Sequence, residues 1–179
     1  MASQKKESWE WLKALAVALI LAGAIRYFLF APIVVDGESM MPTLHNRDRL
    51  VVNKMDKPER FDIVVFKATE TKDYIKRVIG LPGDKIEYKN DTLYVNGKPL
   101  KEKYLDPYKK QTKDGNLTYD FTLYEVTGKQ TVPKGKVFVL GDNRRHSSDS
   151  RNIGTVDMDD IIGKASVKFW PINDIGVVK

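Results

Sequence analysis

The chain opens with a long apolar run, from residue 12 to residue 30, which is followed by short alternating apolar and polar stretches. At ~1.5 Å per residue, ~19 helical residues cross the ~30 Å hydrocarbon layer of a bilayer, so the run predicts a single N-terminal transmembrane helix. Arg26 lies near the end of the run, where its long side chain can reach the lipid headgroups. Trp9, Trp11 and Tyr27 lie near the two ends, where aromatic rings favour the membrane interface.

The charges around this run predict its orientation. Lys5, Lys6 and Lys13 flank its start, and basic residues tend to stay on the cytoplasmic side of a membrane. We therefore predict a cytoplasmic tail over residues 1–11 and an extracytoplasmic domain over residues 31–179, held at the cell membrane by a single-pass anchor.

Two other interpretations of the run stay open. The Lys-rich start, the apolar centre and the small residues at 22–24 also fit a cleavable signal peptide, and a long apolar helix can instead be buried in a core. The apolar stretch continues through residues 27–30 and reaches spanning length, which favours the transmembrane helix over both.

Beyond Pro32 the stretches become short and rich in β-branched and aromatic residues, bounded by Gly, Pro, Asn or Asp. This pattern is typical of strands and predicts a mostly β domain. We expect strands at residues 33–35, 50–52, 63–66, 74–79, 93–95, 137–140 and 166–169. Asn96-Gly97 predicts a hairpin turn, because both residues tolerate positive φ. Residues 101–129 are polar, with Asp-Pro and Asp-Gly pairs, and predict a peripheral insertion.

Composition narrows the chemistry that is possible. The 179 residues are 42% hydrophobic and 30% charged, as in an ordinary folded protein, and cysteine is absent. His45 and His146 are the only histidines, so thiolate and histidine-rich metal sites are excluded, and we expect no metal and no cofactor. The net charge of +6 suits an anionic bilayer surface. Because no nucleic-acid-binding motif accompanies that charge, we expect no nucleic acid as a partner.

With cysteine absent and histidine scarce, a hydrolase here needs serine or threonine as its nucleophile, and the open question is the base. Lys76 is a candidate, because strand alternation places it on an apolar face with Tyr74 and Val78. A lysine accepts a proton only when burial lowers its pKa from ~10.4. A lone lysine at such a position is otherwise explained as a surface residue whose stem packs on the sheet.

Three polar segments accompany this lysine, and each by itself is explained as a turn or a solvated loop. Residues 37–44 place Ser39 between a flexible glycine and Pro42. Such a loop can lift a hydroxyl into a cleft and aim its N–H groups at an oxyanion. Residues 81–84 form a tight turn, and residues 141–151 are dense in hydrogen-bonding groups.

Together these segments resemble the conserved boxes of bacterial type I signal peptidases. The boxes are residues 39–44 (SMMPTL), 76–84 (KRVIGLPGD) and 141–151 (GDNRRHSSDSR), and the match spans nearly the whole chain. The short length and single anchor resemble the enzymes of Gram-positive bacilli. The resemblance implies a membrane-bound serine endopeptidase whose antiparallel β-sheet catalytic domain is of the signal peptidase and repressor-protease kind.

The resemblance also implies roles for individual residues. Ser39 is the nucleophile, with its N–H in the oxyanion hole, and Lys76 is the general base. The supporting residues are Ser147, which hydrogen-bonds the lysine, the ion pair of Asp149 and Arg151 with Arg144 beside it, and Asp142 as a further carboxylate. The residues implied in substrate binding are Val35, Met40, Leu44 and Ile75.

Two positions depart from the family pattern. Gly37 stands where Gram-negative relatives often carry a second oxyanion-hole serine, so the oxyanion hole is only partly assigned. Phe61 replaces a glycine that often precedes residues 62–65, which we expect to affect the local turn and not the chemistry. A Ser-His-Asp triad that uses His45 or His146, each near an aspartate, is the alternative to the lysine.

The same resemblance implies the substrate, which is a secretory preprotein cut after an Ala-x-Ala-like site. Ser39 follows residue 30 by nine residues, at most about 30 Å of chain, so we expect the active site near the phospholipid membrane. Two other classes stay open: a repressor-type self-cleaving protease with a similar dyad, and an anchored β domain without catalytic activity. The sequence gives no basis for predicting the oligomeric state.

Overall fold

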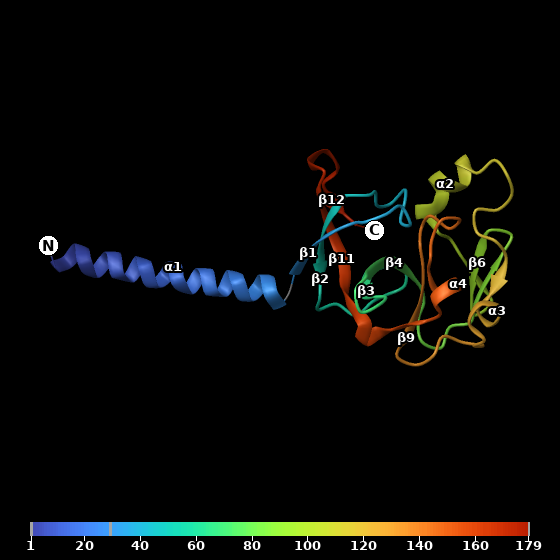
Figure 1. Cartoon of the computed structure of the whole chain (residues 1–179), viewed down its shortest axis with the longest axis horizontal. Coiled ribbons are helices and arrows are strands. Elements are labelled where there is room, and N and C mark those ends of the chain that lie inside the picture. Colours follow the sequence, from blue (N-terminus) through green and yellow to red (C-terminus); the bar gives the residue numbers. More distant parts are fainter. Residues whose placement is uncertain (1, 29, 179) are drawn as a thin grey trace.

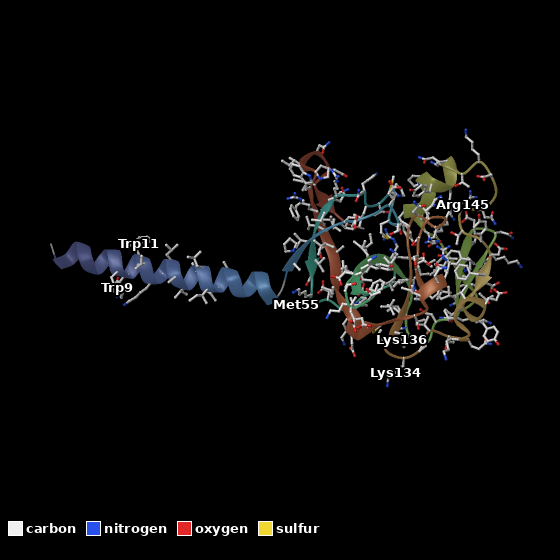
Figure 2. The ribbon with its side chains drawn as sticks, viewed as in Figure 1. Trp9, Trp11, Met55, Lys134, Lys136 and Arg145 are labelled. Carbon is white, nitrogen blue, oxygen red and sulfur yellow. The ribbon has the colours of Figure 1, made fainter. Side chains whose placement is uncertain are left out.

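The computed structural model describes residues 2–28 and 30–178 of the chain. One long helix, α1 (Ala2–Phe28), projects away from a β-rich domain, which the chain enters through β1 (Phe30–Val34) (Figure 1). Alanine and leucine, both strong helix formers, dominate α1. Trp9 and Trp11 lie on this helix, far from the domain (Figure 2). Within the described residues, no helix combines the length and the apolarity that crossing a bilayer requires.

The larger sheet carries the residues of interest and is antiparallel throughout its described ladders. Its strands run in the order β1-β2-β11-β3-β4-β9-β10, and β12 pairs with β11. Their bounds are β2 (Arg49–Asn53), β3 (Ile63–Lys67), β4 (Asp73–Gly80), β9 (Lys136–Leu140), β10 (Val156–Asp157), β11 (Ile161–Trp170) and β12 (Gly176–Val177). Pro32 lies in β1 at the edge of this sheet, where a missing N–H is tolerated.

A smaller antiparallel sheet packs beside the first, with strands in the order β7-β6-β5-β8. Its strands are β5 (Ile86–Lys89), β6 (Thr92–Val95), β7 (Lys98–Leu100) and β8 (Phe121–Thr122). The short helices are η1 (Lys103–Leu105), α2 (Asp106–Gln111), α3 (Leu123–Thr127), α4 (Ser150–Ile153), η2 (Met158–Asp160) and η3 (Ile172–Asp174). A hydrophobic cluster that includes Ile79 and Phe138 of the large sheet and Tyr88 and Leu93 of the small one joins the two sheets.

The prediction of a mostly β, antiparallel domain is confirmed, and each expected strand overlaps an observed one. Asn96 and Gly97 adopt φ of 52° and 77° between β6 and β7, which confirms the hairpin. The sequence pattern did not indicate β5, β8, β10 or β12, most of which are very short. Residues 101–129 contribute β8 to the small sheet and also bury Leu105 and Leu123.

A second hydrophobic cluster lies directly beneath the loop between β1 and β2. Val35, Met40 and Leu44 of this loop are buried against Val52, Ile75 and other side chains of the large sheet. Buried apolar anchors on both sides of residue 39 fix the loop to the sheet, and this position brings it close to β4.

Candidate active site

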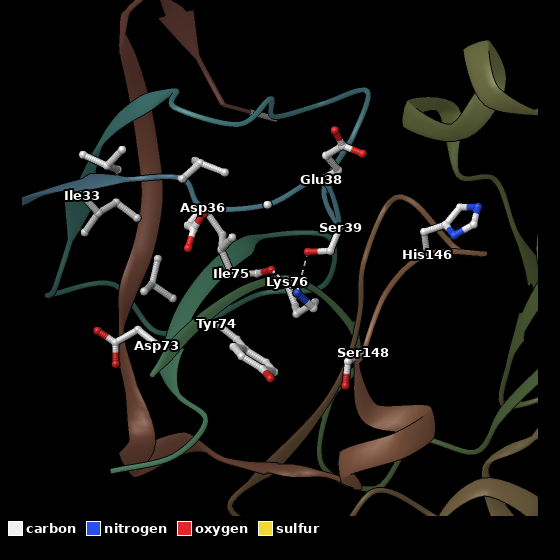
Figure 3. A pocket seen from close by; sticks show the side chains of 14 residues that line it. Ile33, Asp36, Glu38, Ser39, Asp73, Tyr74, Ile75, Lys76, His146 and Ser148 are labelled. Carbon is white, nitrogen blue, oxygen red and sulfur yellow. Dashed lines mark hydrogen bonds between the residues drawn. The ribbon is translucent and has the colours of Figure 1, made fainter. Parts of the chain in front are cut away.

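Ser39 and Lys76 meet at the floor of a cleft in the large sheet. Ser39 comes from the loop after β1, and Lys76 comes from the middle of β4. The Lys76 Nζ lies 2.8 Å from the Ser39 Oγ and also 2.8 Å from the Ile75 carbonyl oxygen, to which it donates (Figure 3). Thirty-seven positions along the chain separate the two residues. The fold therefore creates a contact that neither local segment makes by itself.

The Lys76 amine is buried, with only 4% of the residue exposed. Desolvation lowers the pKa of Lys76 to about 8, because burial disfavours the charged form; Asp149 and Asp142 oppose this shift through their negative charges. The Tyr74 ring, whose centroid lies 5.1 Å from Nζ, covers the amine. A neutral lysine is thereby accessible near physiological pH, and a neutral amine is the form that can accept a proton.

The Ser39 loop is held in a tight conformation. Gly37 has φ of +95°, which other residues rarely adopt, and its N–H donates to the Asn46 Oδ1 at 3.1 Å. The Met41 N–H donates to the Glu38 carbonyl, and the Leu44 N–H donates to the Met40 carbonyl. These bonds turn the chain sharply around the serine, so that its hydroxyl faces the lysine.

The loop after β9 closes on Ser39 from the other side. The Asn143 N–H donates to the Ser39 carbonyl oxygen at 3.0 Å, and a Cβ on Gly141 would lie only 2.5 Å from that oxygen. Only glycine permits so close an approach at position 141. Ser147 packs against the same glycine, and its Oγ is buried without a hydrogen-bond partner among the described residues. The hydrogen bond from Ser147 to Lys76 that we expected is therefore not formed.

Asp142 is fully buried and pairs with Arg77, the residue after the lysine. The Arg77 Nε and Nη2 donate to its two oxygens at 2.8 and 2.7 Å, and the Thr43 hydroxyl donates to it as well. Arg77 lies in one of the conserved boxes of the sequence, but no role was predicted for it. Its position one residue after Lys76, and hence on the opposite face of β4, was the available signal.

The Arg77 guanidinium also explains the backbone at Phe61. Phe61 adopts φ of +73°, the left-handed conformation for which glycine is favoured, and its carbonyl oxygen accepts from the Arg77 Nη1 at 2.7 Å. The turn is therefore present with phenylalanine in place of glycine. Packing of its ring against the hydrophobic cluster between the sheets accompanies this unusual conformation.

Asp149 and Arg151 form the expected ion pair, with Nε–Oδ1 and Nη2–Oδ2 distances of 2.8 Å. Asp149 also accepts from the Gly141 N–H and caps α4 through the Arg151 N–H. We had expected the Arg144 side chain to join this pair, but it does not. Only the Arg144 carbonyl oxygen accepts a hydrogen bond from Arg151. The Arg144 guanidinium instead pairs with Glu102, which supplies a buried carboxylate 2.6 Å from the Arg144 Nη2.

The cleft above the dyad has a volume of about 520 Å³. Val35 and Ile75 line it as predicted, together with Ile33, Val65 and Tyr74, which the sequence analysis did not assign. Met40 and Leu44 were also expected there, but both are buried in the core beneath the loop because their side chains anchor it.

Neither histidine is placed for a triad. His146 lines the cleft, but in Figure 3 its ring lies away from the Ser39 hydroxyl. His45 is an exposed residue of the same loop as Ser39, and its backbone N–H donates to Asp48. The lysine is thus the basic side chain that contacts the serine.

A serine hydroxyl within hydrogen-bonding distance of a buried amine, beside an open cleft, is an arrangement in which lysine can serve a serine hydrolase in place of histidine. Residues 8–170 match the family described as signal peptidase, peptidase S26. The chain belongs to this family and is a serine endopeptidase.

Individual relatives are similar over nearly the whole chain. Signal peptidase I of Bacillus caldolyticus is 52% identical over 178 residues, with 96% of each chain covered. Signal peptidase IB of Staphylococcus aureus is 44% identical over 178 residues, with 95% of this chain and 93% of the relative covered. The crystal structure of a signal peptidase I from Enterococcus faecalis superimposes with a TM-score of 0.59 at 47% identity, covering 62% of this chain and 98% of that one.

Proposed function

We propose that this endopeptidase removes N-terminal signal peptides from exported preproteins, with Ser39 as nucleophile and Lys76 as general base. The observation that carries the proposal is the 2.8 Å contact between the Ser39 Oγ and the Lys76 Nζ, whose pKa burial lowers to about 8. The relatives are signal peptidases that match this chain over nearly their whole length, and they support the substrate class.

The chemistry follows from this contact. Ser39 attacks the scissile carbonyl carbon while its proton passes to the neutral Lys76 amine. The Ser39 N–H is a donor to the developing oxyanion, whereas Gly37 offers no hydroxyl and its N–H is already bonded to Asn46. The protonated lysine then gives its proton to the leaving amine. Lys76 next deprotonates a water molecule, which hydrolyses the acyl-enzyme and restores Ser39.

The strands around the dyad suit an extended substrate. β9 pairs with β4 only from Arg77 onward, so residues 73–76 have an open edge beside the cleft. β1 also borders the cleft, and it pairs on one side with β2. A peptide that pairs with such edges turns alternate side chains toward Val35 and Ile75. Shallow apolar pockets of this kind favour small residues, as in an Ala-x-Ala site.

We further propose that residues 12–30 anchor the enzyme in the cell membrane, with residues 1–11 cytoplasmic and the domain outside. Leu15, Leu19 and Ile20 on α1 are 58–70% exposed, and a lipid environment removes this apolar surface from water. α1 leaves the domain through β1, close in sequence to Ser39 (Figure 1). A cut made near the membrane suits a substrate that is itself threaded through it.

Incubation of the detergent-solubilised enzyme with a preprotein, followed by sequencing of the new N-terminus, tests the proposed function. We expect one new terminus, directly after an Ala-x-Ala site, and no product with Ser39→Ala. Cleavage at unrelated positions, or none by the wild-type enzyme, would reject the proposal. Alkaline carbonate extraction tests the anchor, because an integral protein stays in the membrane pellet and a peripheral one is released.

A further inference from the structure

Glu102 is a buried carboxylate at the beginning of residues 101–129, the segment that the sequence indicated as peripheral. It is 5% exposed and accepts hydrogen bonds from the Tyr88 hydroxyl at 2.9 Å and the Tyr104 hydroxyl at 2.6 Å. The Arg144 Nη2 donates to it at 2.6 Å. Such a fully partnered buried charge fixes the geometry of its neighbours, because any displacement leaves a buried charge without its partners.

One path leads from Glu102 to the backbone of Ser39 through Arg144. The Arg144 Nη1 donates to Tyr88 and Thr118, while its Nε donates to the Gly141 carbonyl oxygen at 3.0 Å. Gly141 begins the loop whose Asn143 N–H donates to the Ser39 carbonyl. The Arg144 guanidinium therefore holds the loop after β9, and this loop contacts the backbone of Ser39.

A second path reaches the same Ser39 loop through Tyr104. The Tyr104 ring lies beneath the Arg77 guanidinium, with 3.8 Å between its centroid and the Arg77 Cζ. Arg77 holds Asp142 with two hydrogen bonds, and the Thr43 hydroxyl donates to the same carboxylate. Thr43 lies four residues after Ser39 in the same loop. Glu102 is thus hydrogen-bonded to Arg144, which holds the loop after β9, and to Tyr104, which packs against Arg77. Both paths to the Ser39 loop begin at this carboxylate.

We propose that Glu102, which lies between β7 and η1, is a positioning residue for the reaction and fixes the Ser39 loop and the loop after β9 against each other. The inference rests on the proposed function, since it assigns Glu102 a part in the step that Ser39 performs. Because Glu102 does not line the cleft, its loss changes the alignment of Ser39 with Lys76 and leaves substrate contacts in place.

The first test is Glu102→Gln, which keeps the size and one acceptor but leaves Arg144 without its counter-charge. We expect kcat for cleavage of a preprotein-derived peptide to fall by ~10-fold or more, while KM changes by less than about 2-fold, because misalignment acts on the chemical step. Water entering the loosened site restores hydration to Lys76, so the midpoint of the pH–rate profile should move to more alkaline pH. Glu70→Gln, on an exposed turn, is the matched control and should behave as the wild type.

The double variant Glu102→Leu with Arg144→Met separates positioning from stability. Removing both buried charges should restore resistance to urea that Glu102→Gln loses, but kcat should stay low because the bonds to Gly141 and Tyr104 are gone. If kcat recovers together with stability, the role is structural and the inference is wrong. It is also wrong if folded Glu102→Gln matches the wild type in kcat and pH profile. Absence of cleavage by the wild-type enzyme would instead reject the proposed function.

Discussion

Lys76 and Arg77 are neighbouring basic residues on β4 that are buried in very different surroundings. Lys76 and Arg77 are both nearly inaccessible, at 4% and 1% exposed, and strand alternation turns them to opposite faces. Lys76 contacts a hydroxyl and a carbonyl, and burial lowers its pKa to about 8. Arg77 is matched by two hydrogen bonds to Asp142 and by the Tyr104 ring. A buried lysine can lose its proton and serve as a base, whereas a guanidinium keeps its charge and suits a structural ion pair.

The largest effect in this comparison is expected on the Lys76 side. Ser39→Ala and Lys76→Ala should each reduce kcat/KM for a preprotein-derived peptide by ~10³-fold or more, since each removes a group from the chemical step. Circular dichroism should show both variants folded. Lys72→Ala, an exposed lysine four residues before, is the control and should keep full activity. Wild-type turnover by Lys76→Ala would disprove lysine as the base.

On the Arg77 side the expected effect is on stability. Asp142→Ala removes the carboxylate that accepts two hydrogen bonds from the buried Arg77 guanidinium, which should reduce the free energy of unfolding by about 3–5 kcal/mol. Urea denaturation measures this. Asp157→Ala breaks the exposed pair with Lys136 and should cost less than ~1 kcal/mol. Equal losses in the two variants would show that the buried pair contributes no more to the free energy of unfolding than the exposed pair.

Replacing the lysine should stabilise the fold. The Lys76 pKa is about 8 when folded and near the ordinary lysine value of 10.5 when unfolded, so the unfolded chain binds more protons between these pH values. Lys76→Met should therefore raise the free energy of unfolding by up to about 3 kcal/mol below pH 8, with the gain fading as pH approaches 10.5. Urea denaturation of the wild-type protein and of Lys76→Met at pH 7 and at pH 10 measures this gain. A gain that does not depend on pH would contradict the assigned pKa shift.

The smallest effect is the pH dependence of the wild-type enzyme. Because only neutral Lys76 accepts the Ser39 proton, kcat/KM should rise about tenfold per pH unit below a midpoint near pH 8 and level off above it. Stopped assays between pH 6 and pH 9.5 measure this profile. Tyr124→Phe, at an exposed position on α3 away from Lys76, should keep the shape of the curve. A flat profile would argue against the lysine.

The sequence predicted the parts of this molecule that local pattern or motif determines. The strands with β-branched runs, such as β3 and β9, were expected at nearly their observed positions, because burial on both faces leaves a continuous apolar signal. The pairing of Ser39 with Lys76 was expected from the order of the boxes. The strands β8, β10 and β12, with two residues each, are too short to leave any periodicity.

Contacts between distant segments could not be predicted in the same way. Arg144 pairs with Glu102, 42 positions away, and which carboxylate it meets depends on how the two sheets pack. Met40 and Leu44 are apolar residues near a serine, a description that fits a pocket wall and a core anchor equally well. The structure places them in the core because the loop needs buried side chains to hold its turn.

The open edge of β4 has a consequence for what the enzyme leaves intact. Only a stretch of chain whose main-chain N–H and C=O groups are unused can form hydrogen bonds with residues 73–76. An Ala-x-Ala sequence inside a helix or an existing sheet has already committed these groups. If substrates pair with β4 as proposed, folded cargo is spared whatever its sequence, and selection rests on local conformation as much as on the two small side chains.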